Sequence, residues 1–399
     1  MNPFFIKKAV TAVLFLFVLF AGFLLNFSNT YGEIKETVRQ EKDMSALIAS
    51  IDTIVNENAF AKYSCIELYG YIQDVLYKNE ENDFEVVKDK NGFLHYMYFE
   101  NKAKDTSNLV DSLKTFQNEL LNQNTNFMYV MPPDKYIEGY TEISTGLPYH
   151  YANETADDFL ARLQKEGISY LDYRQKLGES GIPYEKLFYQ TDHHWTIETA
   201  FWAYTSLLDY LENEYDQTFK HKEYYTDLNN YNCITYPNSF IGSMGRKTGT
   251  LYSGVDDFTL IYPKFVTDFS YDIETGDVQL SMEGRFDEAL LVMEPFIYKG
   301  NKYDVQADKY SSYLYGNQGI AHIKNNLNTE GPKVLIVKDS FMVPVAAFLS
   351  TVCSDVYLVD PRYYEGNIID FTNDIEELDY VMVAFSPQDL TEEFFRFGE

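Results

Sequence analysis

One short stretch decides the fold: Val334-Leu335-Ile336-Val337-Lys338-Asp339-Ser340-Phe341. Its four consecutive branched apolar residues predict a buried strand, because uninterrupted runs of this kind are typical of strands covered on both faces. The strand ends near Ser340, and we expect a helix to follow, with Pro344 in or near its first turn. A serine at such a junction lies at the carboxyl edge of a parallel sheet, where open α/β folds bind their ligands. The stretch therefore predicts a parallel sheet and offers Ser340 as a nucleophile.

Helical and strand-like segments alternate through much of the remaining chain. Some segments have apolar residues at helical spacing, and short apolar runs lie between them. The predicted helices are residues 109–121, 156–166 and 196–211, and the predicted strands are residues 127–131 and 168–171. This alternation predicts an α/β fold with a mainly parallel sheet covered by helices.

Residues 250–303 interrupt the alternation. They contain runs of period two, such as residues 258–262 and 278–282, separated by Gly, Asp and Asn. A period of two is typical of strands with one buried face. We therefore expect a β-rich insertion in the α/β body.

The N-terminus predicts a membrane anchor. Lys7 and Lys8 precede an uncharged run, residues 9–25, and acidic residues begin at Glu33. This order places the two cations in the cytoplasm and the rest of the chain outside, and no clear signal-peptidase site follows the run. We expect an uncleaved single-pass signal anchor, with a cleaved signal peptide as the alternative. The expected organisation is the anchor over residues 1–32, a helical stalk and entry segment over 33–100, with helix over 31–78, and a catalytic domain over 101–399.

Charge and cysteine content exclude several classes of site. The 399-residue chain has 32 Lys and Arg against 61 Asp and Glu, a net charge of −29. This charge would repel nucleic acid phosphates, so no nucleic acid partner is expected. The three cysteines, Cys65, Cys233 and Cys353, are far apart and form no CxxC pair. Neither a disulfide framework nor a thiolate zinc site is therefore predicted.

The densest group of chemically active side chains is Thr191-Asp192-His193-His194-Trp195-Thr196. In an extended or turn-like segment, residues two apart share a face, so we expect Asp192 beside His194, with His193 turned away. Thr196 would then cap the following helix. A carboxylate that accepts a hydrogen bond from one imidazole nitrogen leaves the other nitrogen as a general base. Asp192 and His194 are therefore two members of a Ser-His-Asp triad that Ser340 would complete.

Other interpretations of these residues stay open on sequence grounds. A His beside an Asp is often structural, and Ser340 is also a common residue type at a helix N-cap. Asp192, His193 and His194 could instead ligate a metal, as in metal-dependent phosphoesterases, but neighbouring side chains do not all converge on one ion. We therefore predict no metal and no other cofactor. The glycine-rich residues 242–249 lack the order of a phosphate-binding P-loop, so we expect a tight turn near the cleft.

Together these motifs resemble the bacterial DHHW proteins, which are similar to the SGNH-like acetyltransferases of alginate O-acetylation. Residues 191–196 match the signature that supplies Asp and His in that group, and residues 338–341 match the block that supplies Ser. The order Asp, His, Ser agrees with the group and is permuted relative to ordinary SGNH hydrolases. Residues 240–249, 315–317 and 360–364 resemble further segments of the group.

The resemblance implies an SGNH-hydrolase-like three-layer α/β/α fold and a catalytic set of Ser340, His194 and Asp192. Lys338 stands where the group has the Gly of its nucleophile block. For the oxyanion hole we expect the Ser340 N–H, with Asn317 or Arg362 as helpers, although Arg362 could equally be a surface ion-pair partner. Trp195 is expected at the substrate, because aromatic faces suit sugar stacking.

The expected activity is that of an extracytoplasmic carbohydrate O-acetyltransferase or acetylesterase, acting on a cell-envelope or exported polysaccharide. If transfer is the activity, the resemblance implies a membrane O-acyltransferase as the partner that delivers acetyl groups. Two other classes stay open: a catalytically inactive carbohydrate-binding protein on the same scaffold, and a metal-dependent phosphoesterase. Turnover of a small acetyl ester and its response to a chelator would separate the three.

Overall fold

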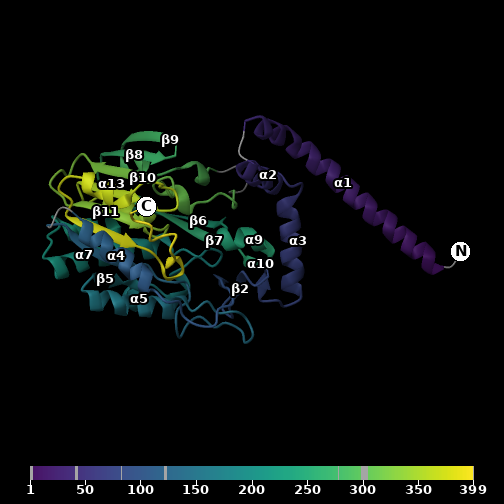
Figure 1. Ribbon diagram of the computed structural model, residues 1–399, viewed down its shortest axis with the longest axis horizontal. Helices are drawn as coiled ribbons and strands as arrows, with labels where there is room; N and C mark the ends of the chain where they lie inside the picture. Colours follow the sequence, from purple (N-terminus) through teal and green to yellow (C-terminus); the bar gives the residue numbers. More distant parts are fainter. Residues whose placement is uncertain are drawn as a thin grey trace.

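The computed structural model describes residues 3–40, 44–81, 83–120, 124–276, 278–297 and 304–398. Its body is built on an eight-stranded sheet with the strand order β5-β4-β13-β11-β12-β10-β8-β9 (Figure 1). The strands are β4 (Asn126–Met131), β5 (Ser169–Asp172), β8 (Phe269–Thr275), β9 (Val278–Gly284), β10 (Ile320–Asn325), β11 (Lys333–Lys338), β12 (Asp355–Val359) and β13 (Tyr380–Ala384). From β5 to β12 the neighbours are parallel, and β10, β8 and β9 add an antiparallel edge. The predicted mainly parallel sheet is confirmed.

Helices cover both faces of this sheet, which gives the body three layers (Figure 1). In the central strand β11, Val334 and Ile336 belong to one apolar core, whereas Leu335 and Val337 belong to the other. Successive side chains of a strand point to opposite faces, so a strand covered on both sides needs an uninterrupted apolar run. The first core includes α7 (Ile197–Tyr215) and α12 (Met342–Leu349), and the second includes α4 (Ser107–Glu119), α5 (Ala152–Glu166) and α13 (Ile368–Asp374). The three-layer α/β/α fold is confirmed.

Strands occupy the stretch that was expected to be β-rich. Strand β7 (Asp256–Pro263) pairs with β6 (Tyr231–Phe240) outside the central sheet. Strands β8 and β9 instead extend the central sheet at its antiparallel edge. Residue 277 and residues 298–303 lie outside the described part of the chain. The stretch is therefore continuous with the body and carries one edge of its sheet.

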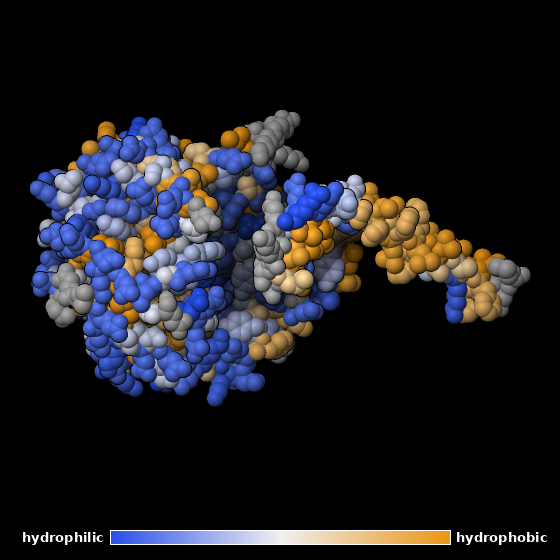
Figure 2. Space-filling model, turned by 45° about the horizontal axis from the view of Figure 1, so that its top comes forward, coloured by the Kyte–Doolittle hydropathy of each residue, from blue (hydrophilic) through white to orange (hydrophobic). Residues whose placement is uncertain are grey.

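The N-terminal helix α1 (Pro3–Gln40) projects from the body (Figures 1 and 2). Its segment Phe4–Ser28 is long and apolar enough to cross a membrane, with a mean hydropathy of 2.5, and none of that segment is buried in the protein. This helix is consistent with a single-pass membrane anchor.

The helix predicted over residues 31–78 is divided into several helices. After α1, the chain forms α2 (Met44–Glu57), which packs against α1, and α3 (Lys62–Val75). Ala61, with a φ of 56°, lies in the left-handed region between α2 and α3 and turns the chain there. A turn at an alanine leaves no proline or glycine signal in the sequence, which explains why the break between α2 and α3 was not predicted. Residues 41–43, between α1 and α2, lie outside the described part of the chain.

Short elements join α3 to the body. They are a three-stranded sheet of β1 (Glu80–Glu81), β2 (Val86–Lys88) and β3 (Leu94–Tyr96), and the helices α9 (Ser243–Thr248) and α10 (Thr250–Ser253). The other short helices are α6 (Tyr173–Lys176), α8 (Lys222–Tyr225) and α11 (Phe286–Ala289). Helix α3 contacts both α9 and α10. Domain boundaries at residues 32 and 100 stay predictions.

Candidate active site

Polar groups follow the carboxyl ends of four neighbouring strands of the sheet. Asp134 and Lys135 follow β4, Ser340 follows β11, Arg362 follows β12 and Ser386 follows β13. The carboxyl ends of parallel strands meet at one edge, which is where open α/β folds bind ligands. All five residues line one cavity of about 210 Å³. This cavity is the candidate active site.

Ser340, His194 and Asp192 form a chain of hydrogen bonds at this edge. Ser340 Oγ lies 2.6 Å from His194 Nε2, and His194 Nδ1 lies 2.5 Å from Asp192 Oδ1. Ser340 is partly exposed, and its hydroxyl does not cap α12. The structure therefore brings together the three residues that the sequence singled out. In this arrangement the imidazole can take the serine proton while the carboxylate orients the ring.

The Asp192 carboxylate is ionised and held from two sides. Its Oδ1 accepts a hydrogen bond from the backbone N–H of His194 at 3.0 Å, which closes a turn. Burial alone would raise its pKa, but the two neighbouring imidazoles and its hydrogen bonds outweigh burial and hold the pKa well below the usual range. An ionised carboxylate at this position stabilises the imidazolium that forms when His194 takes a proton.

The glycine-rich loop supplies the second contact of Asp192. The Ser243 N–H, at the start of α9, donates to Asp192 Oδ2 at 2.6 Å. A Cβ at Gly242 would lie only 2.2 Å from the Cβ of Asp192, so this close approach requires glycine. A tight turn was expected over residues 242–249, but Ser243–Thr248 form the short helix α9, which begins beside the cleft. The role of Ser243 was missed, and its signal is a serine directly after a glycine at a helix start.

Lys135, which follows β4, holds the loop of residues 189–192. Its buried ammonium donates to the backbone carbonyls of Tyr189, Gln190 and Asp192 at 2.7, 3.0 and 2.7 Å. Burial lowers the pKa of Lys135 to about 8, although nearby aspartates oppose this change. Sequence reasoning also missed this residue, because a lysine after two prolines carries no signal of burial.

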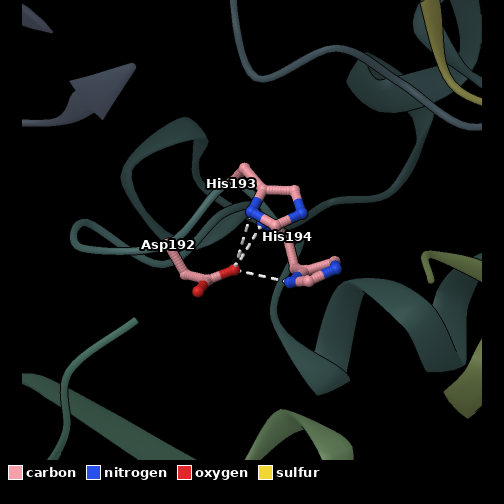
Figure 3. Close-up of side chains that lie close together, drawn as sticks. All are labelled: Asp192, His193 and His194. Carbon is pink, nitrogen blue, oxygen red and sulfur yellow. Dashed lines mark hydrogen bonds and ion pairs between the residues drawn. The ribbon is translucent and has the colours of Figure 1, made fainter. Parts of the chain in front are cut away.

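His193 was predicted to turn away from Asp192, but its ring lies beside the Asp192 carboxylate. Its Nδ1 lies 3.4 Å from Asp192 Oδ1 and 3.0 Å from Ser243 Oγ, and its ring centroid lies 3.8 Å from that of His194 (Figure 3). The difference arises because residues 192–194 lie in a bend, and a bend does not send neighbouring side chains to opposite sides as an extended strand does. Burial and the neighbouring His194 lower the pKa of His193. His193 therefore reaches the cleft as a neutral ring.

Asp192, His193 and His194 also have ligand atoms within 4.8 Å of one another, as a metal site would need. Their hydrogen bonds do not fit this use. Asp192 offers Oδ1 to His194 and Oδ2 to Ser243, and His194 Nε2 faces Ser340. Within the described ranges, no acidic, His or Cys side chain from another element joins the three. The donor set therefore does not match a tetrahedral or octahedral metal centre.

Trp195 was predicted to contact the substrate, but it does not reach the cleft. Its side chain is fully buried, and Nε1 donates to Tyr310 Oη at 3.1 Å and to the Phe341 carbonyl at 3.2 Å. The Tyr310 ring in turn stacks on His194, with centroids 3.9 Å apart. Trp195 therefore supports the site from the core. Tyr310 was missed, because it lies far from His194 in the sequence.

Arg362 lines the first cavity and also a second cavity of about 180 Å³ beside Ser340. Asp360 binds its guanidinium twice, through Nε at 2.9 Å and Nη2 at 2.7 Å. The remaining nitrogen, Nη1, makes no hydrogen bond to any residue that the structure describes. Burial opposes the charge on Arg362, but Asp360 outweighs burial and raises its pKa. Arg362 is thus an ion-pair partner and also faces the cleft.

Asn317 lines the second cavity and is held by Lys338. The Lys338 ammonium donates to Asn317 Oδ1 at 2.8 Å and lies 3.3 Å from Asp360 Oδ2. Burial lowers the pKa of Lys338, with Asp360 opposing that change. Lys338, which stands where the DHHW group has a Gly, therefore links Asn317 to Asp360. With its oxygen engaged, Asn317 has its Nδ2 donors left for a ligand.

The buried carboxyl group of Asp339 fixes the turn around Ser340. Asp339 Oδ1 accepts from the Phe341 N–H at 2.9 Å, and Oδ2 accepts from the Ser386 N–H at 2.6 Å. Asp339 and Asp389 are hydrogen-bonded to each other, and burial together with their mutual repulsion raises the pKa of Asp389 well above its usual range. Asp339 is buried and Asp389 is half-buried, and one proton held between them relieves the repulsion of the two carboxyl groups.

Two family models match the chain. The model for the SGNH hydrolase-like domain of the acetyltransferase AlgX matches residues 87–230, and the model for DHHW proteins matches residues 179–359. No curated protein sequence matches. The resemblance to the DHHW proteins and the SGNH-like acetyltransferases is confirmed.

Solved structures have the same fold. PatB1 of Bacillus cereus, solved with a sulfonyl adduct, aligns with a TM-score of 0.62 and 18% identity over 79% of this chain and 100% of its own. A DHHW family protein from Eubacterium siraeum aligns with a TM-score of 0.52 and 19% identity, covering 79% and 95% of the two chains. At these identities the likeness concerns the fold.

Proposed function

We propose that this chain, which matches the DHHW and SGNH-like acetyltransferase models, is an extracytoplasmic carbohydrate O-acetyltransferase or acetylesterase. The observation that carries the proposal is the hydrogen-bond chain from Ser340 Oγ through His194 to Asp192. Ser340 is the nucleophile, His194 the general base and acid, and Asp192 the group that orients and stabilises the imidazole.

The first half-reaction forms an acetyl-enzyme. Ser340 Oγ attacks the carbonyl carbon of an acetyl ester while His194 Nε2 takes the hydroxyl proton. When the tetrahedral intermediate collapses, the bond to the donor oxygen breaks, and that oxygen takes the proton from His194. The donor alcohol leaves, and the acetyl group stays on Ser340 as an ester.

The second half-reaction regenerates the serine. A sugar hydroxyl attacks the acetyl-serine carbonyl and passes its proton to His194, which returns it to Ser340 Oγ. Water in place of the sugar gives hydrolysis, so the acceptor alone separates a transferase from an esterase. Each half-reaction has a lower barrier than direct exchange would have.

Both tetrahedral intermediates place a negative charge on the former carbonyl oxygen. We assign its stabilisation to the Ser340 N–H, with Asn317 Nδ2 and Arg362 Nη1 as helpers. Both side chains line the second cavity beside Ser340, and both are fixed by the Lys338 and Asp360 contacts. Preorganised donors of this kind are usually the largest single contribution to acyl transfer.

The acetyltransferase model and the apolar N-terminal helix support a polysaccharide outside the cell membrane as the substrate class. In this proposal a membrane O-acyltransferase delivers acetyl groups when transfer is the activity.

Intact-protein mass spectrometry tests the acetyl-enzyme. The full chain and Ser340→Ala are incubated with p-nitrophenyl acetate, quenched in acid and weighed. We expect one added acetyl group in the wild type, mapped to Ser340, and none at that peptide in the variant. No acetylation and no ester turnover would favour a binding protein on an inactive scaffold. Phosphoester turnover that a chelator abolishes would favour a metalloenzyme and overturn the proposal.

A further inference from the structure

Helix α3 carries an apolar stripe that the proposed function does not use. Leu68, Tyr71, Ile72 and Val75 are spaced i, i+3, i+4, i+7, so they share one face of the helix. These four residues are 45% to 61% exposed, whereas Gly70 and Gln73 on the opposite side are buried. Such a stripe on a helix normally faces a core. Here its face has no partner within the described chain.

The stripe cannot turn inward, because α3 is fixed to the body by its other side. A Cβ at Gly70 would lie 2.1 Å from the Thr248 carbonyl oxygen, so the two backbones are in close contact. The Glu67 carboxylate accepts hydrogen bonds from Thr250 N, Thr250 Oγ1 and Leu251 N at 2.8, 2.9 and 3.0 Å. These contacts hold the outward orientation of the stripe.

The turn that leads into α3 lies at the end of the apolar segment of α1. The Phe60 N–H donates to Asn26 Oδ1 at 2.7 Å, and Asn58 Nδ2 donates to Glu33 Oε2 at 2.9 Å. Asn26 is two residues before the end of the candidate span Phe4–Ser28. Phe60 is 50% exposed at this level. An exposed apolar side chain at the end of the span lies where hydrocarbon gives way to headgroups.

We propose that α3 lies on the outer surface of the lipid bilayer that α1 spans, with the stripe in the boundary between headgroups and acyl chains. We choose lipid as the partner of the stripe because α3 follows directly after the turn at Phe60, which is bonded to the end of the membrane span in α1. Hydrophobic atoms cover α1 and also gather on the part of the molecule beside it (Figure 2). Helices with one apolar face bind membrane surfaces in this way.

This attachment brings the cleft close to the membrane. Helix α3 contacts α9, and α9 supplies the Ser243 N–H that holds Asp192. The body would therefore contact the bilayer near its active site and would not move freely at the end of a flexible stalk. The inference is independent of the proposed chemistry.

Two native cysteines provide a matched test. Cys65 lies on α3 and is exposed, Cys233 lies near the start of β6 and is exposed, and Cys353 is buried. The far end of β6, at Phe240, leads into α9, so Cys233 lies at the end of β6 away from α3. Full-length Cys233→Ser and Cys65→Ser proteins are labelled with an NBD probe and reconstituted in phosphatidylcholine vesicles with or without nitroxide-labelled lipid.

We expect the probe on Cys65 to show blue-shifted emission and several-fold stronger quenching by nitroxide lipid than the probe on Cys233. The double change Leu68→Glu and Tyr71→Glu should reduce that quenching, whereas Val266→Glu, at an exposed apolar residue of the body, should not. Equal quenching at both cysteines would overturn the proposal. Protection of Cys65 only in native membranes, and not in lipid alone, would also overturn it and indicate a protein partner. Ester turnover of all variants is followed separately, so loss of chemistry cannot be mistaken for loss of attachment.

Discussion

The contact between Ser340 Oγ and His194 Nε2 decides what the cleft can do. His194 is fixed on every side: Asp192 binds its Nδ1, the Tyr310 ring stacks on its face, and His193 lies against it. A ring held this firmly needs little reorganisation when it takes a proton. The choice of His194 over His193 as the base is therefore a sharp test of the site.

His194→Ala should lower kcat/KM for a small acetyl ester by about 10³-fold or more, because the general base is lost. His193→Ala should keep activity within about tenfold, since its Nδ1 bonds Ser243 Oγ and the ring nitrogen that bonds Ser340 belongs to His194. Steady-state kinetics with circular dichroism as a folding check measures both. Equal loss in the two variants, with the fold intact, would point to a metal site or a shared structural role.

Lys135 should matter through the loop that it holds. Lys135→Met leaves the carbonyls of Tyr189, Gln190 and Asp192 without their ammonium donor, so we expect a loss of about 2–4 kcal/mol in unfolding free energy and a lower kcat. The matched control is Lys90→Met, which removes an exposed pair with Glu142 and should cost less than about 1 kcal/mol. Thermal unfolding in detergent compares them, and equal stability of the two variants would refute this role.

The sequence predicted the central residues of the site and missed their supports, for a physical reason. Asp192 and His194 lie two apart, and Ser340 lies at a strand end, so local patterns reveal all three. Ser243, Tyr310 and Lys135 reach the site only through tertiary packing. Trp195 was misplaced because an aromatic residue next to a reactive cluster fits a core as well as a cleft.

Among the elements, the alternation of helix and strand was the most predictable feature. The uninterrupted apolar run of β11 indicates burial on both faces. The start of α7 is indicated by the cap at Thr196, and its buried side by the helical spacing of its apolar residues. The division of the N-terminal helical region could not be predicted, because it depends on Ala61 and on the contact of Phe60 with Asn26. Pairing partners of β8 and β9 likewise depend on contacts between distant segments.

The small sheet after α3 contains a buried acid that should make stability depend on pH. Burial raises the pKa of Glu81 to about 7, with Glu80 adding to this and Lys78, Gln73 and Lys88 opposing it. The folded state then binds more protons than the unfolded state between pH 4.5 and 7, so this residue lowers stability as pH rises through that window.

Glu81→Gln should therefore raise the unfolding free energy at pH 8 by about 2 kcal/mol and change little at pH 4. Glu80→Gln, at the neighbouring half-buried residue, serves as the control and should show a much smaller dependence. Thermal melts of the full chain in detergent from pH 4 to 8 measure the effect. If stability depended on pH in the same way in Glu81→Gln as in the wild type, the burial of this carboxyl group would be contradicted.

For the molecule as a whole, the acidic body and the apolar α1 predict how the protein distributes in a cell. The full chain should fractionate with membranes and resist a carbonate wash, because Phe4–Ser28 is long enough to cross the bilayer. A chain that begins at Glu33 should be released by the same wash or by mild detergent. Edman sequencing of the mature protein is the deciding measurement, since a form that starts shortly after Leu25 would replace the anchor with a cleaved signal peptide.

Covalent labelling of Ser340 tests the central claim most directly. A sulfonyl fluoride should react with Ser340 Oγ, with loss of fluoride, because His194 removes the hydroxyl proton. We predict labelling at Ser340 in the wild type, slower labelling in Asp192→Ala and almost none in His194→Ala, as read by peptide mass spectrometry. Labelling of Ser340 at the same rate in wild type and His194→Ala, or no labelling of the folded wild type at all, would contradict a nucleophilic Ser-His-Asp site.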